Sequence, residues 1–310
     1  MKVCVVGAGA LGSTIGGTLA AGGCDVVLIA RNRAHVDAVN QHGLRMVEGD
    51  EERTVEVEAR TSAEGIGPAD LVVVLVKSFH TGEAIRAAAP IIGEHTLVMS
   101  LQNGLGHEDI LAEVVGRERV LGAKTYVGGV FLGPGHVRSG VRGKETVIGE
   151  LGGGVTPRVQ RLADAMNRAG LLTEVSPEIM GTIWDKLLIN VSTGAVSAIT
   201  RLTYGPLYAL PEVEACAVEA VAEAMAVARV AGITLSMRDP REAWEKAAAG
   251  LPFEFKTSML QSLEKGSVTE IDFINGAVVR WGERVGVPTP VNRTLVALIK
   301  GVERAIGATA

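Results

Sequence analysis

The first half of the chain alternates short apolar runs with glycine-rich turns and helical stretches. An apolar run at 2–6 leads into a glycine-rich turn, a helix of small residues to about Gly22, and a second apolar run at 26–29. A strand, a glycine-rich turn, a helix and a further strand form a βαβ unit, which implies a parallel sheet. Further strands are predicted at 71–76, 96–100, 120–125 and 171–175, and helices near 81–92, 107–116 and 156–169.

Two segments of this half have a different pattern. Residues 54–59 alternate strictly between polar and apolar side chains, which predicts a half-exposed strand that can pair with 44–47 across Gly49-Asp50. Residues 126–149 are rich in glycine and in strand-forming residues. They predict additional antiparallel strands at the edge of the sheet.

Ser176-Pro177 marks a change of character, because strand-like alternation stops there. The rest of the chain is predicted to be helical at 179–198, 211–231, 240–249, 256–265, 270–286 and 291–306. The sequence therefore predicts an α/β, Rossmann-type parallel sheet domain over 1–176, followed by an all-α domain over 177–310. The alanine-rich helix near 212–231 can form a subunit interface or pack within its own domain.

Composition narrows the class of protein. The 310 residues carry a formal net charge of -5, with 47% hydrophobic and only 4% aromatic residues. This balance argues against nucleic-acid binding and against global disorder. The densest strand-like apolar run, Leu71–Val76, is far shorter than the roughly 20 residues of a membrane span. We expect a folded, cytoplasmic protein with no membrane partner.

Cysteines and histidines do not suggest a metal site. Cys4, Cys24 and Cys216 are too scattered for a disulfide framework or a zinc site, so we expect reduced thiols. The six histidines, none with the spacing of metal ligands, are expected to be surface or loop residues.

The glycine-rich turn is the clearest functional motif. Gly7, Gly9 and Gly12 follow a strand and open a helix, which is the context of a dinucleotide-binding loop. The first glycine permits a tight turn, the second lets the backbone approach a pyrophosphate, and the third lets helix and strand pack closely. The start of the helix then faces the phosphate charge.

The end of the second strand favours NADP(H) over NAD(H). NAD-binding domains place an acidic residue there to bind the ribose hydroxyls, but the only acid near this strand, Asp25, lies at its start. Arg31 and Arg33 follow the strand instead. Guanidinium groups suit a 2′-phosphate, although solvated loop arginines remain an alternative, especially for Arg33.

A carbonyl reductase also needs a proton donor. No Tyr-x-x-x-Lys pair occurs in the chain. Lys186 and Asn190 are four residues apart and share one face of a predicted helix, where a lysine can stabilise a substrate anion or deliver a proton. An ordinary amphipathic helix with a solvated asparagine explains the spacing equally well. Glu270 and Asp272 each suit a helix start, and spacing does not decide between a structural and a functional role.

Taken in order along the chain, these motifs resemble the ketopantoate reductase (2-dehydropantoate 2-reductase) family. The resemblance extends from Met1 to about Glu303. The segments that carry it are Gly7-Ala8-Gly9-Ala10-Leu11-Gly12, Arg31, Val76-Lys77-Ser78, Leu101-Gln-Asn103-Gly104, Trp184-Asp-Lys186-Leu-x-x-Asn190, Ser258-Met-Leu-Gln261, Thr269-Glu270 through Gly276, and Val287-Pro-Thr-Pro290.

The resemblance implies an NADPH/NADP+-dependent reduction of 2-dehydropantoate to (R)-pantoate in pantothenate biosynthesis, on the coenzyme A pathway. It implies that the second domain is similar to the C-terminal domain of 6-phosphogluconate dehydrogenase. NADPH would bind Gly7–Gly12, with Arg31 at the 2′-phosphate and Lys77 and Asn103 near the nicotinamide and the reacting centre. Lys186 would be the general acid, and Glu270 would orient it or hold a hydroxyl. Asn190 and Ser258, with Asn103 and Lys186, would bind the 2-oxo acid. No metal is implied, and a homodimer is left open.

The chain departs from the family at three positions that often carry asparagine, which here are Gly194, Tyr204 and Phe255. These departures concern substrate contacts, so the reaction class is a firmer inference than the substrate. The alternatives are a relative that reduces another 2-oxo acid or small carbonyl compound, a β-hydroxyacid dehydrogenase, and a non-catalytic NADP(H) redox sensor.

Overall fold

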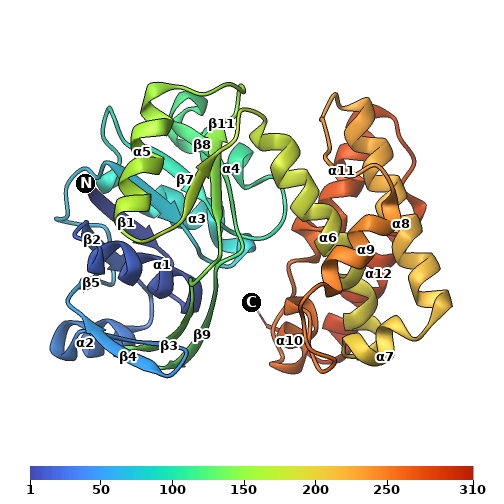
Figure 1. Cartoon of the computed structure of the whole chain (residues 1–310), viewed down its shortest axis with the longest axis horizontal. Helices are drawn as coiled ribbons and strands as arrows, with labels where there is room; N and C mark the ends of the chain where they lie inside the picture. Colours follow the sequence, from blue (N-terminus) through green and yellow to red (C-terminus); the bar gives the residue numbers. More distant parts are fainter. Residues whose placement is uncertain (310) are drawn as a thin grey trace. The chain divides into compact units, whose positions relative to one another are not determined.

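The computed structural model describes residues 1–309, which form two compact units. The first unit contains Met1–Gln102 and His107–Ile179. The second contains the chain from Met180 onward and, in addition, the short segment Asn103–Gly106. Each unit has its own architecture and is described separately (Figure 1).

The first unit is built on an eight-stranded sheet with the order β12-β11-β8-β7-β6-β1-β2-β5. Its strands are β1 (Lys2–Val6), β2 (Asp25–Ile29), β5 (Glu58–Arg60), β6 (Leu71–Val74), β7 (Leu97–Ser100), β8 (Val120–Thr125), β11 (Thr146–Glu150) and β12 (Thr173–Val175). Every neighbouring pair is parallel except β8 and β11. The chain leaves β1 toward β2 on one side and later continues to β6 on the other side.

The sheet has a hydrophobic core on each face, because successive residues of a strand point to opposite sides. Val3 and Val5 of β1 belong to one core, whereas Cys4 and Val6 belong to the other. The helices and 3-10 turns of this unit are α1 (Ala10–Ala21), α2 (Arg33–His42), η1 (Ser78–His80), α3 (Thr81–Ala87), η2 (Ala89–Ile91), α4 (His107–Val115), η3 (Arg117–Arg119) and α5 (Pro157–Arg168). Helices α1, α2 and α5 contribute to the first core, and α3 and α4 to the second.

A second, four-stranded sheet has the order β4-β3-β10-β9. It consists of β3 (Leu44–Glu48), β4 (Glu51–Val55), β9 (Gly128–Gly133) and β10 (His136–Gly140). The predicted pairing of 44–47 with the following strand is confirmed in part: β3 and β4 form the hairpin, but β4 ends at Val55 and β5 joins the main sheet beside β2.

The expectation for 126–149 is also correct only in part. Strand β11 does lie antiparallel in the main sheet, but β9 and β10 join β3 in the small sheet instead of the edge of the main one. Strand propensity identified these segments, but it does not determine which partner a strand finds, because that depends on the tertiary contacts of its side chains.

The second unit consists of helices: α6 (Ile179–Thr200), α7 (Tyr204–Tyr208), α8 (Pro211–Val230), α9 (Pro240–Ala248), α10 (Ser258–Glu264), η4 (Ile271–Phe273), α11 (Asn275–Val285) and α12 (Pro290–Ala305). Proline occupies an early helical position in α8, α9 and α12, where its missing N–H costs no helical hydrogen bond. Helix α7 was not predicted. The helix predicted at 270–286 is divided into η4 and α11 by Ile274, whose backbone (φ -106°, ψ -95°) is not helical.

The alanine face of α8 packs within its own unit. Four alanines spaced by three or four residues are fully buried, namely Ala217, Ala220, Ala224 and Ala228. Helix α8 contacts α9, α11 and α12. Glu223 of α8 also accepts hydrogen bonds from the backbone N–H groups of Val291 and Asn292, at 2.8 and 3.0 Å, and thereby caps the start of α12.

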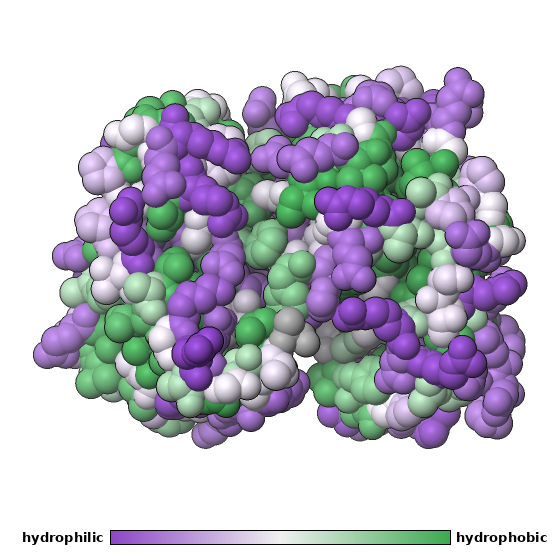
Figure 2. Space-filling view, turned by 180° about the vertical axis from the view of Figure 1, so that it is seen from behind, coloured by the Kyte–Doolittle hydropathy of each residue, from purple (hydrophilic) through white to green (hydrophobic). Residues whose placement is uncertain are grey.

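Hydrophilic side chains are spread across the face of the molecule seen in Figure 2, with smaller hydrophobic areas between them. Within residues 1–309, no helix combines the length and the apolar character that a membrane crossing requires.

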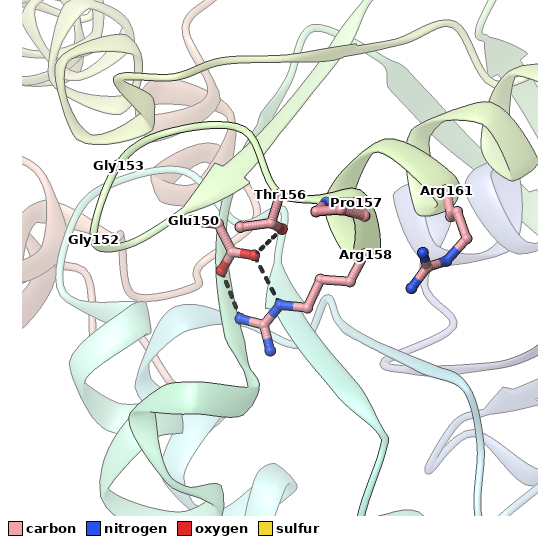
Figure 3. Close-up of a pocket in the computed structure, with 7 residues that line it drawn as sticks. All are labelled: Glu150, Gly152, Gly153, Thr156, Pro157, Arg158 and Arg161. Carbon is pink, nitrogen blue, oxygen red and sulfur yellow. Dashed lines mark hydrogen bonds and ion pairs between the residues drawn. The ribbon is translucent and has the colours of Figure 1, made fainter.

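A charged pair stabilises the start of α5. Arg158 donates two hydrogen bonds to the carboxylate of Glu150 at the end of β11, at 2.7 and 2.6 Å, and Thr156 donates a third at 2.5 Å (Figure 3). The pair borders an open hollow of about 530 Å³ that none of the predicted site residues line. The Arg158 guanidinium, together with the Thr156 hydroxyl, lowers the pKa of the Glu150 carboxyl, although burial opposes that shift.

We predict that Glu150→Gln lowers the free energy of unfolding by about 1–2 kcal/mol at pH 7, because a bidentate ion pair between the buried Glu150 and the partly exposed Arg158 becomes a weaker neutral contact. The folded-state pKa of Glu150 lies below its unfolded value. The contribution is therefore complete above about pH 4.5 and is lost as the pH falls through the folded-state pKa. Urea unfolding of wild type and variant from pH 3 to pH 8 measures the difference.

The matched control is Glu283→Gln, which removes an exposed pair with Arg293 at 3.3 Å and should change stability by less than about 0.5 kcal/mol. An equal cost for both variants, or a cost for Glu150→Gln that persists at pH 3, would contradict this role for the Glu150–Arg158 pair.

Candidate functional site

The glycine-rich turn connects β1 to α1, and two of its glycines lie in close contact with neighbouring backbone. Gly7 has a φ of +106°, and a Cβ there would lie 2.5 Å from backbone atoms of Leu75 and Val76. A Cβ on Gly12 would lie 2.2 Å from the carbonyl oxygen of Gly7. Gly9, in contrast, faces open space, with no described atom within 4 Å of the Cβ position. Glycine is therefore required sterically at Gly7 and Gly12, whereas at Gly9 its absent side chain leaves the backbone accessible.

The start of α1 fits a phosphate group. Gly9 is the N-cap and provides no side-chain hydrogen bond, and the first turn, which begins with Ala10 and Leu11, contains no acidic residue. The first N–H groups of a helix lack intrahelical partners and carry partial positive charge. Because this turn has neither an acidic side chain nor a side-chain cap, it fits the pyrophosphate of a dinucleotide.

Arg31 lies just after β2, at the same edge of the sheet as the glycine-rich turn. It is exposed and makes no ion pair within the described part of the chain. Asn32 caps α2 by accepting a hydrogen bond from the backbone N–H of His35 at 3.2 Å, and Arg33 begins that helix. Both guanidinium groups are thus available to an anionic ligand, and neither is used to stabilise the fold through an ion pair.

Lys77 follows β6, and the segment that carries it is held by a side chain that sequence analysis did not assign. Gln102 donates hydrogen bonds from its amide nitrogen to the carbonyl of Val76, at 2.6 Å, and to Thr81, at 3.0 Å. Its amide oxygen accepts from Ser100 at 2.7 Å. Gln102 therefore connects the segments after β6 and β7. Its only signal in the sequence was its position immediately before Asn103.

Asn103 begins the short segment that groups with the second unit. The backbone N–H of Leu105 donates to the carbonyl of Phe273 at 2.8 Å. Gly104 has a φ of +105°, and a Cβ there would lie 2.4 Å from the Phe273 oxygen. The structure thus brings the Asn103 segment against η4, the turn that directly follows Glu270, although the two are far apart in sequence.

Lys186 and Asn190 lie one turn apart on α6, as predicted from their spacing. Between them, Leu187 and Leu188 are buried, so the helix packs through that part of its surface. The amide nitrogen of Asn190 is buried and has no hydrogen-bond partner within residues 1–309. The amide nitrogen of this partly buried side chain is therefore not solvated, in contrast to the solvated asparagine of the alternative interpretation. A buried, unpaired amide donor is costly unless a ligand satisfies it.

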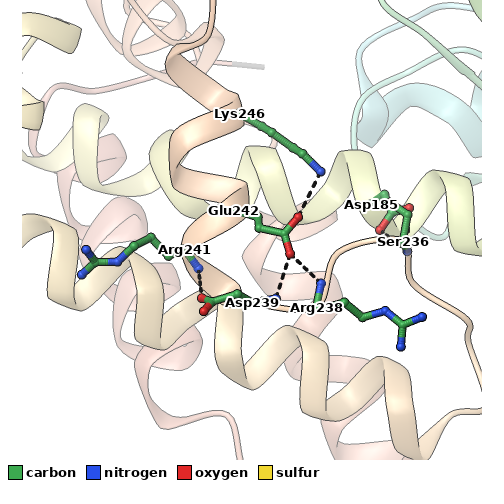
Figure 4. A network of polar contacts seen from close by, with 7 residues as sticks. All are labelled: Asp185, Ser236, Arg238, Asp239, Arg241, Glu242 and Lys246. Atoms are coloured by element: carbon green, nitrogen blue, oxygen red, sulfur yellow. Dashed lines mark hydrogen bonds and ion pairs between the residues drawn. The ribbon is translucent and has the colours of Figure 1, made fainter.

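The turn of α6 that carries Lys186 is anchored to the segment between α8 and α9. Both carboxylate oxygens of Asp185 accept from the backbone N–H of Ser236 at 3.1 Å (Figure 4). At the far end of that segment, Glu242 accepts from the N–H groups of Arg238 and Asp239, at 2.8 and 3.0 Å. The Asp185 contact holds the segment before α9 against α6, whereas the Glu242 contacts close the start of α9 itself.

Glu270 precedes η4, and the backbone on its N-terminal side is held by a buried carboxylate. Glu303 of α12 accepts from both the N–H and the hydroxyl of Thr269, each at 2.7 Å. The Thr269 hydroxyl oxygen in turn accepts from the N–H of Ile271 at 3.2 Å. Asp272, left open as a helix-start charge, forms an ion pair with Lys300 at 2.6 Å.

The three departures from the family pattern lie close together in the second unit. A Cβ on Gly194 would lie 3.5 Å from the Met259 methyl carbon, next to Ser258 at the start of α10. The rings of Tyr204 and Phe255 are 4.9 Å apart, and the Tyr204 hydroxyl hydrogen bonds to Thr193, the neighbour of Gly194, at 3.2 Å. Together they form one largely apolar cluster.

The histidines and cysteines differ in how far they match the expectation. His35 and His107 are buried, so the prediction of surface or loop histidines is wrong for these two. The three cysteines are free thiols, and burial raises the pKa of Cys4 to about 11. Among residues 1–309, no group of three or more His, Cys, Asp or Glu side chains is placed to hold a metal ion.

Comparison with known families matches both parts of the chain. The profile described as ketopantoate reductase PanE/ApbA matches residues 3–153, and the profile of the C-terminal region of the same family matches residues 178–303. The 2-dehydropantoate 2-reductase of Pyrococcus horikoshii is 37% identical over 303 residues, and the comparison covers 98% of both chains. The enzyme of the same name from Halobacterium salinarum is 36% identical and covers 98% of this chain and 99% of its own.

Solved structures with the same fold include a ketopantoate reductase and a dehydrogenase of another name. A PanE/ApbA family ketopantoate reductase from Ralstonia eutropha JMP134 has a TM-score of 0.90 and 38% identity, covering 99% of this chain and 100% of its own. A D-mandelate dehydrogenase in a ternary structure with NADH and anilino(oxo)acetate has a TM-score of 0.91 and 28% identity, with the same coverage.

We predict that Gly104→Ala costs about 1–3 kcal/mol more unfolding free energy than Gly106→Ala. The two glycines have nearly the same φ, +105° and +104°, so both variants carry the strain of a left-handed alanine. Only the Gly104 variant also forces a Cβ against Phe273, since Gly106 has open space. Urea unfolding of the two variants measures the difference, and equal losses would show that the contact with η4 contributes little.

Proposed function

This chain belongs to the ketopantoate reductase family, and on that premise we propose that it reduces ketopantoate (2-dehydropantoate) to (R)-pantoate with NADPH, a step of pantothenate biosynthesis. The observation that carries the proposal is the face of α6 where Lys186 and Asn190 lie one turn apart and the Asn190 amide nitrogen is buried without a partner among residues 1–309. Trp184 Nε1 on the same helix is also buried without a partner among residues 1–309, so the support comes from the position of the Asn190 donor one turn from Lys186, where a ligand can satisfy it.

In the proposal, residues 1–176 form the NADP-binding domain. The backbone of Gly7–Gly12 at the uncapped start of α1 holds the pyrophosphate, and Arg31 holds the 2′-phosphate. Lys77 and Asn103 face the nicotinamide half. When bound, NADPH supplies the hydride for the carbonyl carbon. The finer assignment to NADPH over NADH rests on Arg31 and on the absence of a carboxylate at the end of β2.

Residues 177–310 form the proposed substrate and catalytic domain. Lys186 donates a proton to the carbonyl oxygen of the 2-oxo acid while the adjacent carbon is reduced. Glu270 orients the Lys186 ammonium or holds a hydroxyl group, on a turn that Glu303 keeps in place. The positive charge of Lys186 also stabilises the negative charge that develops on the oxygen.

Asn190 and Ser258, together with Asn103 and Lys186, bind the substrate in this proposal. The Asn190 amide nitrogen supplies a donor that suits a carboxylate or carbonyl oxygen. Ser258 is exposed at the start of α10, beside Met259, which packs toward α6. Asn103 is held near Glu270 by the contact of Leu105 with Phe273.

Three further proposals follow from the family and the composition. The three free cysteines fit a reducing compartment, in agreement with a cytoplasmic enzyme. The substrate is a small 2-oxo acid, with no nucleic-acid or membrane partner. The homodimer that the family resemblance left open stays a prediction, and the alanine face of α8 does not support it, because those alanines pack inside the unit.

A second candidate substrate is an aryl 2-oxo acid. It is favoured by the cluster of Gly194, Tyr204 and Phe255, which replaces amide side chains with small or aromatic ones. Its support from related proteins is the D-mandelate dehydrogenase with 28% identity. The same proton donor and cofactor serve both substrates, so only the substrate contacts distinguish the two candidates.

We predict turnover of ketopantoate with NADPH at a kcat/KM of about 10⁴ M⁻¹s⁻¹ or more, within the ordinary range of enzymes. The loss of NADPH absorbance is followed with ketopantoate and with phenylglyoxylate, the oxo acid that corresponds to mandelate, and NADH is run in parallel. A higher kcat/KM for phenylglyoxylate would transfer the assignment to the aryl substrate. Binding of NADPH without turnover of either acid would reject both substrates.

We predict that Lys186→Ala lowers kcat by about 10²–10⁴-fold, the usual contribution of a positioned proton donor, and leaves the Kd of NADPH nearly unchanged. Steady-state rates and fluorescence titration measure the two quantities. The control is Lys246→Ala, which removes an exposed lysine paired with Glu242 in the same unit and should change neither quantity. A redox sensor would need the glycine-rich turn but not Lys186, so an undiminished signal in the Lys186 variant would favour that alternative.

A further inference from the structure

A buried histidine is connected to the glycine-rich turn through Ser13, and both of its ring nitrogens form hydrogen bonds. His35 is 1% exposed, in the first turn of α2. Its Nδ1 is 3.0 Å from the backbone nitrogen of Gly135, in the turn between β9 and β10, and its Nε2 is 3.1 Å from the hydroxyl oxygen of Ser13 on α1. The ring therefore connects three elements that are far apart in sequence.

The hydrogen-bond donors fix the protonation state of this ring. A backbone N–H can only donate, so Nδ1 of His35 must accept from Gly135 and cannot carry a proton. The ring proton then resides on Nε2 and is donated to the oxygen of Ser13. The Ser13 hydroxyl donates onward to the carbonyl of Ala8, at 3.2 Å. The result is a series of hydrogen bonds in which Gly135 donates to a neutral His35, His35 donates to Ser13, and Ser13 donates to the carbonyl of Ala8 in the glycine-rich turn.

The same residue is tied to the segment that carries Arg31. The backbone N–H of His35 donates to the side chain of Asn32 at 3.2 Å and to its carbonyl at 3.1 Å. Asn32 is the neighbour of Arg31. His35 thus fixes two groups relative to each other: the carbonyl of Ala8 in the proposed pyrophosphate loop and the backbone next to the proposed 2′-phosphate ligand.

Protonation of the ring would break this arrangement. An imidazolium carries a proton on Nδ1, which would face the N–H of Gly135. Burial alone lowers the pKa of His35, since no charged side chain contributes to the shift. The elements around the ring carry further charged or titratable side chains, namely Arg33, Asp37 and His42 of α2, Arg45 and Glu48 of β3, Glu58 and Arg60 of β5, and His136 and Arg138 of β10. All are exposed except Glu48 and His136, which are partly buried.

We propose that His35 is a positioning residue for the cofactor. In its neutral form it holds the carbonyl of Ala8 in the glycine-rich turn and the backbone next to Arg31 in the geometry that binds NADPH. Protonation of the ring weakens that binding at acidic pH. The inference rests on the proposed function, namely that a pyridine dinucleotide binds at Gly7–Gly12. It differs from a packing role, in which the ring would act only through contacts such as that with Phe131, 5.2 Å between ring centroids.

Two substitutions separate the hydrogen bonds of the ring. His35→Gln places an amide donor near the position of Nε2, so it keeps the link to Ser13 and does not titrate, but it has no acceptor at the position of Nδ1 and loses the hydrogen bond from Gly135. His35→Asn places an acceptor near Nδ1 and loses the link to Ser13. Ser13→Ala removes the link and leaves the histidine intact. His42→Gln, at the exposed end of the same helix, is the matched control.

The experiment is a fluorescence titration of the intact protein with NADPH between pH 5.5 and pH 8, with melting curves to confirm that each variant is folded. We expect the wild-type Kd to rise at least about threefold on acidification as the ring takes up a proton, with most of the rise at the acid end of the range, because burial lowers the pKa of His35 below its usual value of about 6.5. His35→Gln should bind at least about threefold more weakly than wild type at pH 8, as acidified wild type does, because it offers no acceptor to the N–H of Gly135, and it should lose most of the pH dependence. His35→Asn and Ser13→Ala should raise Kd at pH 8 by about five- to tenfold, the effect of one lost hydrogen bond.

The 2′-phosphate of NADPH also titrates near pH 6, as phosphate monoesters do, so the titrations are repeated with NADH, which lacks this group. The pH dependence assigned to His35 must remain with NADH and must disappear in the His35→Gln variant. A flat wild-type profile with NADH, or an equal profile in wild type and His35→Gln, would overturn the inference and leave the proposed function intact. Failure of the wild type to bind either nucleotide at pH 8 would instead overturn the proposed function.

Discussion

The parallel pairing of β1 with β2 on one side and β6 on the other is the constraint on which the nucleotide half depends. It brings the carboxyl ends of three strands to one edge, where the chain continues in opposite directions. Doubly wound sheets bind ligands at such a point. The backbone of the glycine-rich turn comes so close to the segment after β6 that a Cβ on Gly7 would lie 2.5 Å from backbone atoms of that segment. Glycine at this position is therefore a consequence of the strand order, and it leaves the start of α1 open to a ligand.

Buried or partly buried polar side chains fix the backbone next to the proposed site residues in each unit. Gln102 holds the backbone before Lys77, His35 and Ser13 hold the carbonyl of Ala8, and in the second unit Glu303 holds the backbone beside Glu270. In each case a side chain outside the proposed reaction binds the main chain next to a residue inside it. Hydrogen bonds in such low-dielectric surroundings are costly to break, which is why they can define a loop geometry.

The departures from the family pattern form one contiguous group. Tyr204 contacts Phe255 and hydrogen bonds to Thr193, the neighbour of Gly194. Residues that touch are expected to be energetically coupled, so Tyr204 and Phe255 have to be considered together, with Gly194 beside the residue that holds Tyr204. The proposed proton donor and the proposed cofactor contacts lie on other residues. A family member can therefore change the substrate that it accepts while it keeps its reaction.

The sequence by itself determined the βαβ start, the change to helices after Ser176-Pro177, the glycine-rich turn and the shared face of Lys186 and Asn190, because each depends on local conformation or helical spacing. It did not determine that β9 and β10 join β3, that 270–286 breaks at Ile274, or that His35 is buried. Strand partners, the docking of Asn103–Gly106 against η4 and the burial of a polar ring depend on contacts between residues far apart in the chain. Only the tertiary structure, which satisfies those polar groups or leaves them open to a ligand, decides them.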